Sequence, residues 1–175
     1  MTTSTSALRA VAHPLRLRML SLLTGAELSA AEVARELDIT HANASYHLRV
    51  LLDAGELVVA GEEKIRGGVA KRYRHDWQRG LDPRHTRGPA SSDARALYMR
   101  ATAEEMVRRF AGRAHGASIL TDAELWVDPE VYQRARALLE DASAMLHAAA
   151  RPPRTEGTQR INLTAALFPM TDEAR

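Results

Sequence analysis

The apolar residues near the start of the chain recur at the spacing of short helices that pack on one core. Leu8 and Val11 predict a first helix that ends before Pro14, because the residue that precedes a proline avoids the helical region. Pro14 suits the first turn of a second helix, where its missing N–H costs nothing, and Gly25 is a stop signal for that helix. The pattern therefore predicts two helices before residue 26.

Two further helical patterns follow, separated by a tight turn. Ser29 is expected to cap the first of them, and Glu32, three residues later, completes a capping box. Asp38 falls in the turn, where it tolerates a left-handed backbone better than most residues. Thr40 offers a second cap, and the helix that it opens stops before Gly55. The sequence thus predicts a helix-turn-helix.

The second helix of this unit has two different faces. Ala44, Leu48 and Leu51 form one buried stripe. The opposite face carries small or hydrogen-bonding residues, namely Ala42, Asn43, Ser45, Tyr46 and Arg49. Such a face suits the major groove of DNA, although an ordinary amphipathic helix with a solvated face has the same pattern. The capped helix before it and the strand pair after it favour the DNA interpretation.

A β-hairpin is expected next. Residues 56–60 and 71–74 have strand-like patterns, and the glycine-containing segment 61–70 between them is predicted to be a loop. The hairpin carries four cations that would lie beside the helix and reach phosphates or an adjacent minor groove, namely Lys64, Arg66, Lys71 and Arg72.

The sequence pattern of the second half of the chain predicts a region separate from the helix-turn-helix unit. Residues 78–90 are rich in glycine, proline and arginine and indicate a linker. Two long helices are expected after it, from Ser92 to about Ala114 and from Pro129 to Pro152, with strands at 123–127 and 159–168. Because two strands form little sheet alone, this small α+β unit would be completed by a second subunit or by packing on the first helix of the winged domain, and we expect it mainly to mediate dimerisation.

Charge supports a polyanionic partner. Residues 64–87 hold eight lysines or arginines against two aspartates, whereas the net charge of the chain is only +2. A solvated loop would have the same composition. The chain has no cysteine, which excludes disulfides, thiolate metal sites and a thiol redox switch. It has no apolar stretch of membrane-spanning or signal-peptide length, so a cytoplasmic location is expected.

Residues 7–77 resemble the winged helix-turn-helix of ArsR-type bacterial transcriptional regulators. The resemblance is carried by the ASYHLRVLLDAGELV segment and by the HPLR start. It implies a homodimer on a pseudo-palindromic operator in double-stranded DNA, and an inward or backbone-facing role for His47. By that resemblance, Thr40, Asn43, Ser45, Tyr46 and Arg49 are expected near bases or phosphates, and His41 and the hairpin cations are included in the predicted DNA-binding set.

Departures from that family argue against metal sensing. The founding members use a cysteine pair before the turn, where residues 27–33 contain no thiol, and others use paired ligands on a C-terminal helix, where residues 92–114 contain no histidine. Four potential ligands, His75, Asp76, Asp82 and His85, have no tight ligand spacing. No metal and no cofactor are therefore expected.

The fold class expected is mainly α with a small β component: a winged helix-turn-helix at 1–77, a basic linker at 78–90 and an α+β dimerisation region at 91–175. Four large side chains, Tyr98, Met106, Phe110 and Trp126, could line a pocket for a small-molecule effector or simply form a core. No catalytic constellation is present, so an enzyme is not expected. The main rival to a DNA-binding repressor is a winged domain that binds protein instead.

Overall fold

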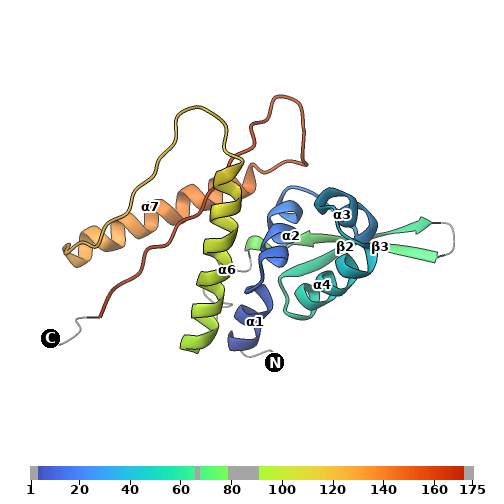
Figure 1. Ribbon diagram of the computed structural model, residues 1–175, viewed down its shortest axis with the longest axis horizontal. Helices are drawn as coiled ribbons and strands as arrows, with labels where there is room; N and C mark the ends of the chain where they lie inside the picture. Colours follow the sequence, from blue (N-terminus) through green and yellow to red (C-terminus); the bar gives the residue numbers. More distant parts are fainter. Residues whose placement is uncertain (1–3, 66–67, 79–90, 172–175) are drawn as a thin grey trace.

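A computed structural model of the chain describes residues 4–65, 68–78 and 91–171. Its first part combines short helices with a small sheet, and its second part holds two long helices (Figure 1). The elements are α1 (Ser4–Val11), α2 (Pro14–Thr24), β1 (Leu28–Ser29), α3 (Ala30–Leu37), α4 (His41–Asp53), β2 (Leu57–Ile65), β3 (Gly68–His75), α6 (Ser92–Ala111) and α7 (Pro129–Ala148). This is an α-rich winged helix-turn-helix with a small antiparallel β wing, and the expected fold class is confirmed.

The predicted helix boundaries of the first part are confirmed by their caps. The Ser29 backbone N–H donates to Glu32 Oε2 at 2.7 Å, and the Ser29 hydroxyl accepts from the Glu32 backbone N–H, which makes the capping box. Asp38 ends α3 with a left-handed φ of 53°. The Thr40 hydroxyl accepts from the Asn43 backbone N–H at 3.2 Å. These local bonds fix the angle at which α4 leaves the turn.

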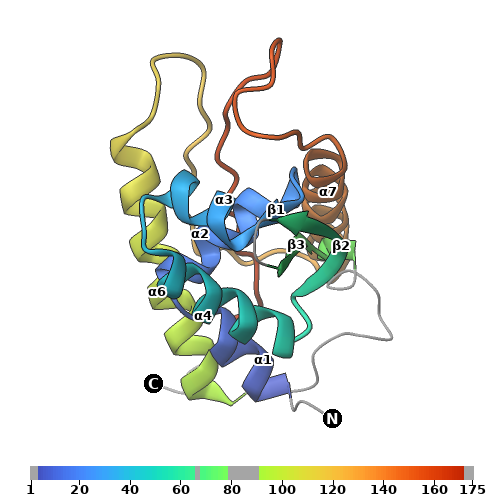
Figure 2. The ribbon, with the colours of Figure 1, turned by 90° about the vertical axis from the view of Figure 1, so that its right-hand side faces the viewer.

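One core holds the first part together. Met19 and Leu23 of α2, Val33 of α3, and Leu48 and Leu51 of α4 are fully buried. Complete burial of an aliphatic side chain of this size stabilises the fold by about 1.5–3 kcal/mol. The buried residues of α4 therefore hold the helix on the core, and α4 lies at the surface of the molecule (Figure 2).

The three strands form an antiparallel sheet in the order β1-β3-β2. Tyr73 in the central strand pairs with Leu28 on one side and with Val59 on the other, and a register shift follows Val59. The prediction of a loop over 61–70 is wrong, because β2 continues to Ile65 and β3 begins at Gly68. Cross-strand pairing satisfies the backbone here and outweighs the weak strand preference of the polar residues.

The second part is built from α6 and α7. α6 packs against α1 and α2, and its Ala94 belongs to the main core. α7 extends to one side and buries no residue (Figure 1). The predicted strands at 123–127 and 159–168 are wrong, since both segments lack regular secondary structure. A strand needs a neighbouring ladder, and neither segment is hydrogen-bonded into a sheet within this chain.

The segment after α7 returns to the first part of the molecule. The Arg151 backbone approaches Gly25 so closely that a Cβ built on Gly25 would lie 2.5 Å from the Arg151 carbonyl oxygen. Arg154 forms an ion pair with Glu36 of α3, and the Asn162 side-chain oxygen accepts from Arg109 at 3.2 Å. The C-terminal segment therefore links α7 to the winged unit.

A buried carboxylate strengthens α6 at the same junction. Glu105 is 3% exposed and accepts hydrogen bonds from Arg108 and Arg109. Burial disfavours its charged form, but the bonds and charges of the two arginines outweigh this and lower its pKa. Arg109 also donates to the Ser21 hydroxyl of α2 at 3.2 Å. This hydrogen bond from Arg109 ties α6 to α2.

We expect Gly25→Ala to destabilise the chain by about 1–3 kcal/mol, because its Cβ overlaps the Arg151 backbone and the C-terminal segment must move. Urea unfolding measures the change. Gly61→Ala is the matched control, since a Cβ at Gly61 meets nothing within 4 Å, and it should change the unfolding free energy by less than about 0.5 kcal/mol. Equal losses in both variants would contradict the close approach at Gly25.

Candidate nucleic-acid interface

α4 turns a polar face outward while its apolar stripe is buried. Ala44, Leu48 and Leu51 are completely buried, as the sequence predicts. The residues of the other face are exposed or half-exposed, and Figure 2 shows α4 at the front of the molecule. This face carries Ala42, Asn43, Ser45, Tyr46 and Arg49, with Thr40 and His41 exposed at the start of the helix. The structure thus brings all the predicted residues of this helix onto one accessible surface.

The amino end of α4 is suited to an anion. Its first turn holds no acidic residue, so the partial positive charge of the helix dipole is not neutralised there. Thr40 satisfies one backbone N–H through its hydroxyl. The helix start can therefore accept a phosphate beside the polar face.

His47 lies beneath this face and is 7% exposed, which confirms its expected inward position. Its ring centroid lies 4.8 Å from that of His13, and its Nδ1 lies 3.5 Å from an Arg16 Nη1 atom. Burial, followed by the charges of His13 and Arg16, lowers the pKa of His47. His13 also has a lowered pKa, mainly through burial. Burial thus favours the neutral form of both rings at the junction of α1, α2 and α4.

The Tyr46 ring packs edge-on to this cluster. Its centroid lies 5.1 Å from that of His47, yet 57% of Tyr46 is exposed. The His13–His47 pair therefore packs against Tyr46, a side chain on the exposed face of α4. The sequence did not predict this contact between the His13-Pro14 start and α4, although both histidines are visible in the quoted motifs.

The wing carries cations of two kinds. Lys64 and Lys71 are exposed, and neither forms an ion pair within the described part of the chain. Arg72 instead turns back and pairs with Glu32 at 3.2 Å and with Glu63 at 3.0 Å. The pair with Glu32 links the wing to the amino end of α3. The side chains of Lys64 and Lys71 therefore present positive charge that is not used in an ion pair within the described residues.

Of the remaining cations of the predicted basic segment, Arg74 lies within the described residues. Arg74 lies 3.7 Å from Glu27 in a looser, exposed pair. Arg66 and residues 79–90, which hold the other arginines of that segment, lie outside the described residues. Glu62 and Glu63 also lie on the wing, so its described part is of mixed charge.

The four candidate effector residues do not come together. Tyr98 lines a cavity beside α2, whereas Trp126 is 88% exposed and borders a different hollow with Val127 and Val131. Met106 and Phe110 are each about half exposed. Among the residues that the structure describes, no group of three or more potential ligands could hold a metal ion, while Asp82 and His85 lie outside them.

Comparison with known families finds a match in the first part of the chain. Residues 11–58 match the model of a helix-turn-helix domain, and they run from the end of α1 through α4 to the start of β2. A search of curated proteins found no match to the chain. Domains of this type typically bind DNA and are not enzymes, so the match supports a DNA-binding regulator in general. No helix in the described ranges is long and apolar enough to cross a membrane.

The neutral histidines predict a pH dependence of stability. Because the folded-state pKa values of His13 and His47 lie below 6.5, the unfolded chain takes up protons first as the pH falls. The unfolding free energy should therefore decrease from about pH 7.5 to about pH 5.5, a range above the titration of the carboxylates. His47→Gln should reduce this decrease in urea unfolding experiments.

His115→Gln is the control for this measurement, since His115 is exposed. It should leave the pH dependence unchanged. A His47→Gln variant with the same pH dependence as the unsubstituted chain would show that His47 does not contribute.

Proposed function

We propose that this protein is an ArsR-like homodimeric transcriptional repressor that inserts α4 into the major groove of a pseudo-palindromic operator. The observation that carries the proposal is the exposed polar face of α4, held at a fixed angle by the capped turn and the buried stripe. A protein-interaction module is the less favoured alternative, because an apolar outer face would suit it better. The helix-turn-helix match supports DNA binding independently.

The outer face divides into two roles. Asn43, Ser45 and Arg49 have the donors and acceptors that read base edges in the major groove. Thr40 and His41, at the amino end of α4, and Tyr46, beside His47, are placed for phosphates. These contacts would set the register of the helix on the duplex, while the first three residues would discriminate sequence.

The wing supplies backbone contacts in this proposal. Lys64 and Lys71 carry its accessible charge and would lie on phosphates or in an adjacent minor groove, with Arg66 assigned the same role from its sequence position. Arg72 contributes mainly by holding the wing against α3 through Glu32. A dimer bound in this way blocks polymerase without further machinery, which favours repression.

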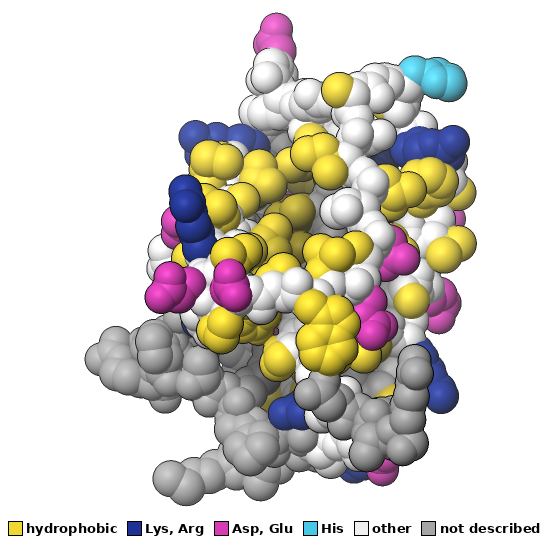
Figure 3. Space-filling view, turned by 90° about the vertical axis from the view of Figure 1, so that its left-hand side faces the viewer, with side chains coloured by type: hydrophobic (Ala, Val, Ile, Leu, Met, Phe, Trp, Pro, Cys, Tyr) yellow, Lys and Arg dark blue, Asp and Glu magenta, His cyan; other side chains and the backbone are white. Residues whose placement is uncertain are grey.

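Dimerisation is supported by the apolar surface of the second part. The face in Figure 3 gathers hydrophobic side chains around a hollow, with charged residues at its rim. Ile119 is 95% exposed, Trp126 is 88% exposed and Leu138 of α7 is 62% exposed. Contiguous apolar surface of this kind is typical of an interface rather than of a solvated face. A second copy of the chain is the occupant that a twofold operator requires.

The experiment that tests DNA binding is a gel-shift titration at several salt concentrations with the DNA upstream of the protein's own gene. Affinity should exceed that for scrambled DNA and should fall as salt rises, because bound phosphates release counterions. Affinity that is equal for both DNAs and insensitive to salt would refute the proposal.

Arg49→Ala should weaken specific binding by about 1–3 kcal/mol and change non-specific binding less. Lys71→Ala should weaken binding to both DNAs and lower the salt slope by about one. Fluorescence anisotropy on the two DNAs measures both effects, with Arg134→Ala on the exposed face of α7 as the control. Identical losses from Arg49→Ala on both DNAs would contradict a base-reading role.

Trp126→Glu or Leu138→Glu should raise the dimer dissociation constant by about tenfold or more, because each places a charge in the apolar surface. Sedimentation velocity over a range of concentrations measures it. Gln133→Glu, an exposed polar site on the same helix, should leave assembly unchanged. A full-length chain that stays monomeric at all concentrations would contradict the dimer.

A further inference from the structure

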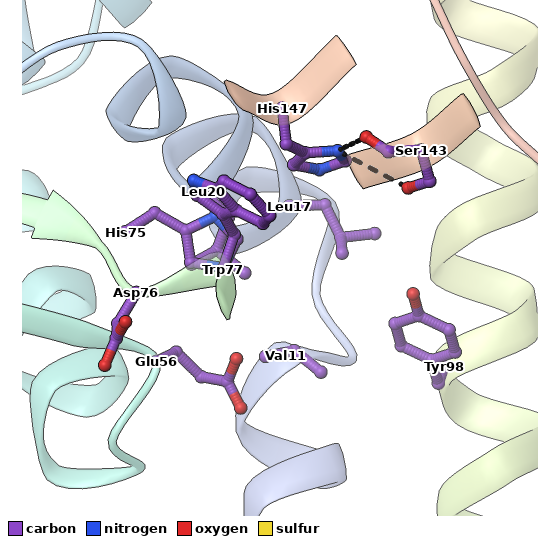
Figure 4. Close-up of a pocket in the computed structure, with 10 residues that line it drawn as sticks. All are labelled: Val11, Leu17, Leu20, Glu56, His75, Asp76, Trp77, Tyr98, Ser143 and His147. Atoms are coloured by element: carbon purple, nitrogen blue, oxygen red, sulfur yellow. Dashed lines mark hydrogen bonds between the residues drawn. The ribbon is translucent and has the colours of Figure 1, made fainter. Parts of the chain in front are cut away.

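Two buried side-chain polar atoms in the described part of the chain have no hydrogen-bond partner, Nε of Arg16 and Oγ1 of Thr102. Other polar groups near the core are satisfied: on the wall of the cavity in Figure 4, His147 Nδ1 donates to the Ser143 carbonyl oxygen at 2.7 Å. Of the two unpaired atoms, only Arg16 Nε belongs to a charged group. A buried donor left without an acceptor costs free energy, so a partner for Arg16 is expected in a complex.

The Arg16 guanidinium also has no counter-charge. It is half-buried, yet it forms no ion pair with any carboxylate that the structure describes. Its Nη2 donates to the Arg9 carbonyl oxygen at 3.3 Å, and its Nη1 lies 3.5 Å from His47 Nδ1, both at the long end of the hydrogen-bond range. Burial lowers the pKa of Arg16, as expected for a cation that is desolvated without an anion beside it. A bound anion would offset this cost.

The groups around Arg16 can donate further hydrogen bonds. His13 Nδ1 accepts from the Leu15 backbone N–H at 3.1 Å, so the proton of the neutral ring is on Nε2, for which the described chain provides no acceptor. The Tyr46 hydroxyl is close enough to Arg16 to act on its charge. Glu104 of α6 acts electrostatically on His13 but forms no ion pair with a described residue. The local surroundings therefore suit an anion.

This group of residues lies at the edge of the exposed face of α4. Tyr46 belongs to that face and packs on His47, which Arg16 contacts from α2. Figures 1 and 2 show α1 and the wing on different sides of α4. Because Arg16 bonds to Arg9 of α1, it lies on the α1 side of α4, away from the lysines of the wing.

We propose that Arg16, with His13 and Tyr46 beside it, forms a binding site for one phosphate of the DNA backbone. A guanidinium presents paired N–H donors that match two phosphate oxygens. A helix in the major groove lies between two phosphate backbones, so the wing would contact one of them and the Arg16 site the other. This inference rests on the proposed DNA-binding function, and it adds a contact that sets the register of α4 from its second side.

Fluorescence anisotropy at several salt concentrations tests the site, with the DNA upstream of the protein's own gene and with scrambled DNA. Arg16→Gln should weaken binding to both DNAs by about tenfold and lower the salt slope by about one, because one phosphate contact is lost. Arg134→Gln removes the same charge from an exposed position of α7 and should change neither quantity. An unchanged slope in Arg16→Gln, or equal losses in both variants, would overturn the Arg16 site and leave the proposed function standing.

Neutral methylphosphonate linkages, placed one at a time in a duplex that the intact protein binds, identify the phosphate. One linkage in each half-site should weaken binding of the intact protein by about tenfold but have no further effect on Arg16→Gln. If circular dichroism shows that Arg16→Gln is unfolded, Arg16→Lys takes its place, since it keeps the charge and loses the paired donors. Linkage effects that are the same in the intact protein and in the variant at every position would overturn the site.

Inorganic phosphate separates a backbone contact from a site for the free anion. If the intact protein binds no DNA, the proposed function fails, and the histidine ring resonances of the full-length protein decide the Arg16 site. Saturating shifts of His13 and His47 with phosphate but not with chloride, absent in Arg16→Gln, would show an anion site for free phosphate and overturn the backbone contact. No saturating shift in a protein that binds no DNA would overturn the site altogether.

Discussion

Burial of the inner stripe of α4 is the interaction on which the rest of the structure depends. Leu48 and Leu51 are completely enclosed by α2 and its neighbours, and this burial fixes the rotation of the helix about its axis. The rotation decides which residues face outward, since burial of one stripe turns the opposite side of α4 away from the core, where its residues are exposed or half-exposed. The caps at Ser29 and Thr40 then set its direction. Packing and capping together create the surface proposed to enter DNA.

The sequence predicted this first part well because its signals are local. A capping box, a left-handed Asp38 and an apolar stripe each depend on residues a few positions apart. The wing was predicted less accurately, because pairing across the hairpin extended β2 and β3 through residues of weak strand preference. The inward turn of Arg72 depends on Glu32, forty positions away, and no local pattern indicates it.

The second part shows the limit of prediction from local pattern. The alternation at 123–127 is real, but an extended segment becomes a strand only when another segment pairs with it. In the same way, the apolar residues of α7 have a helical period, yet the described part of the chain buries none of them. The cavity beside Tyr98 could not be predicted either, because His147 of α7 lines it together with Glu56 and Asp76, which are far away in the sequence.

The most direct measurement of the central claim is selection of binding sites by the full-length protein from a library of random duplex DNA. We expect an enriched inverted repeat whose half-site centres lie about 10 bp, or a multiple of one helical turn, apart, because two copies of α4 would enter successive major grooves on one face of the duplex. A library that shows no enriched sequence, or a motif without twofold symmetry, would contradict it.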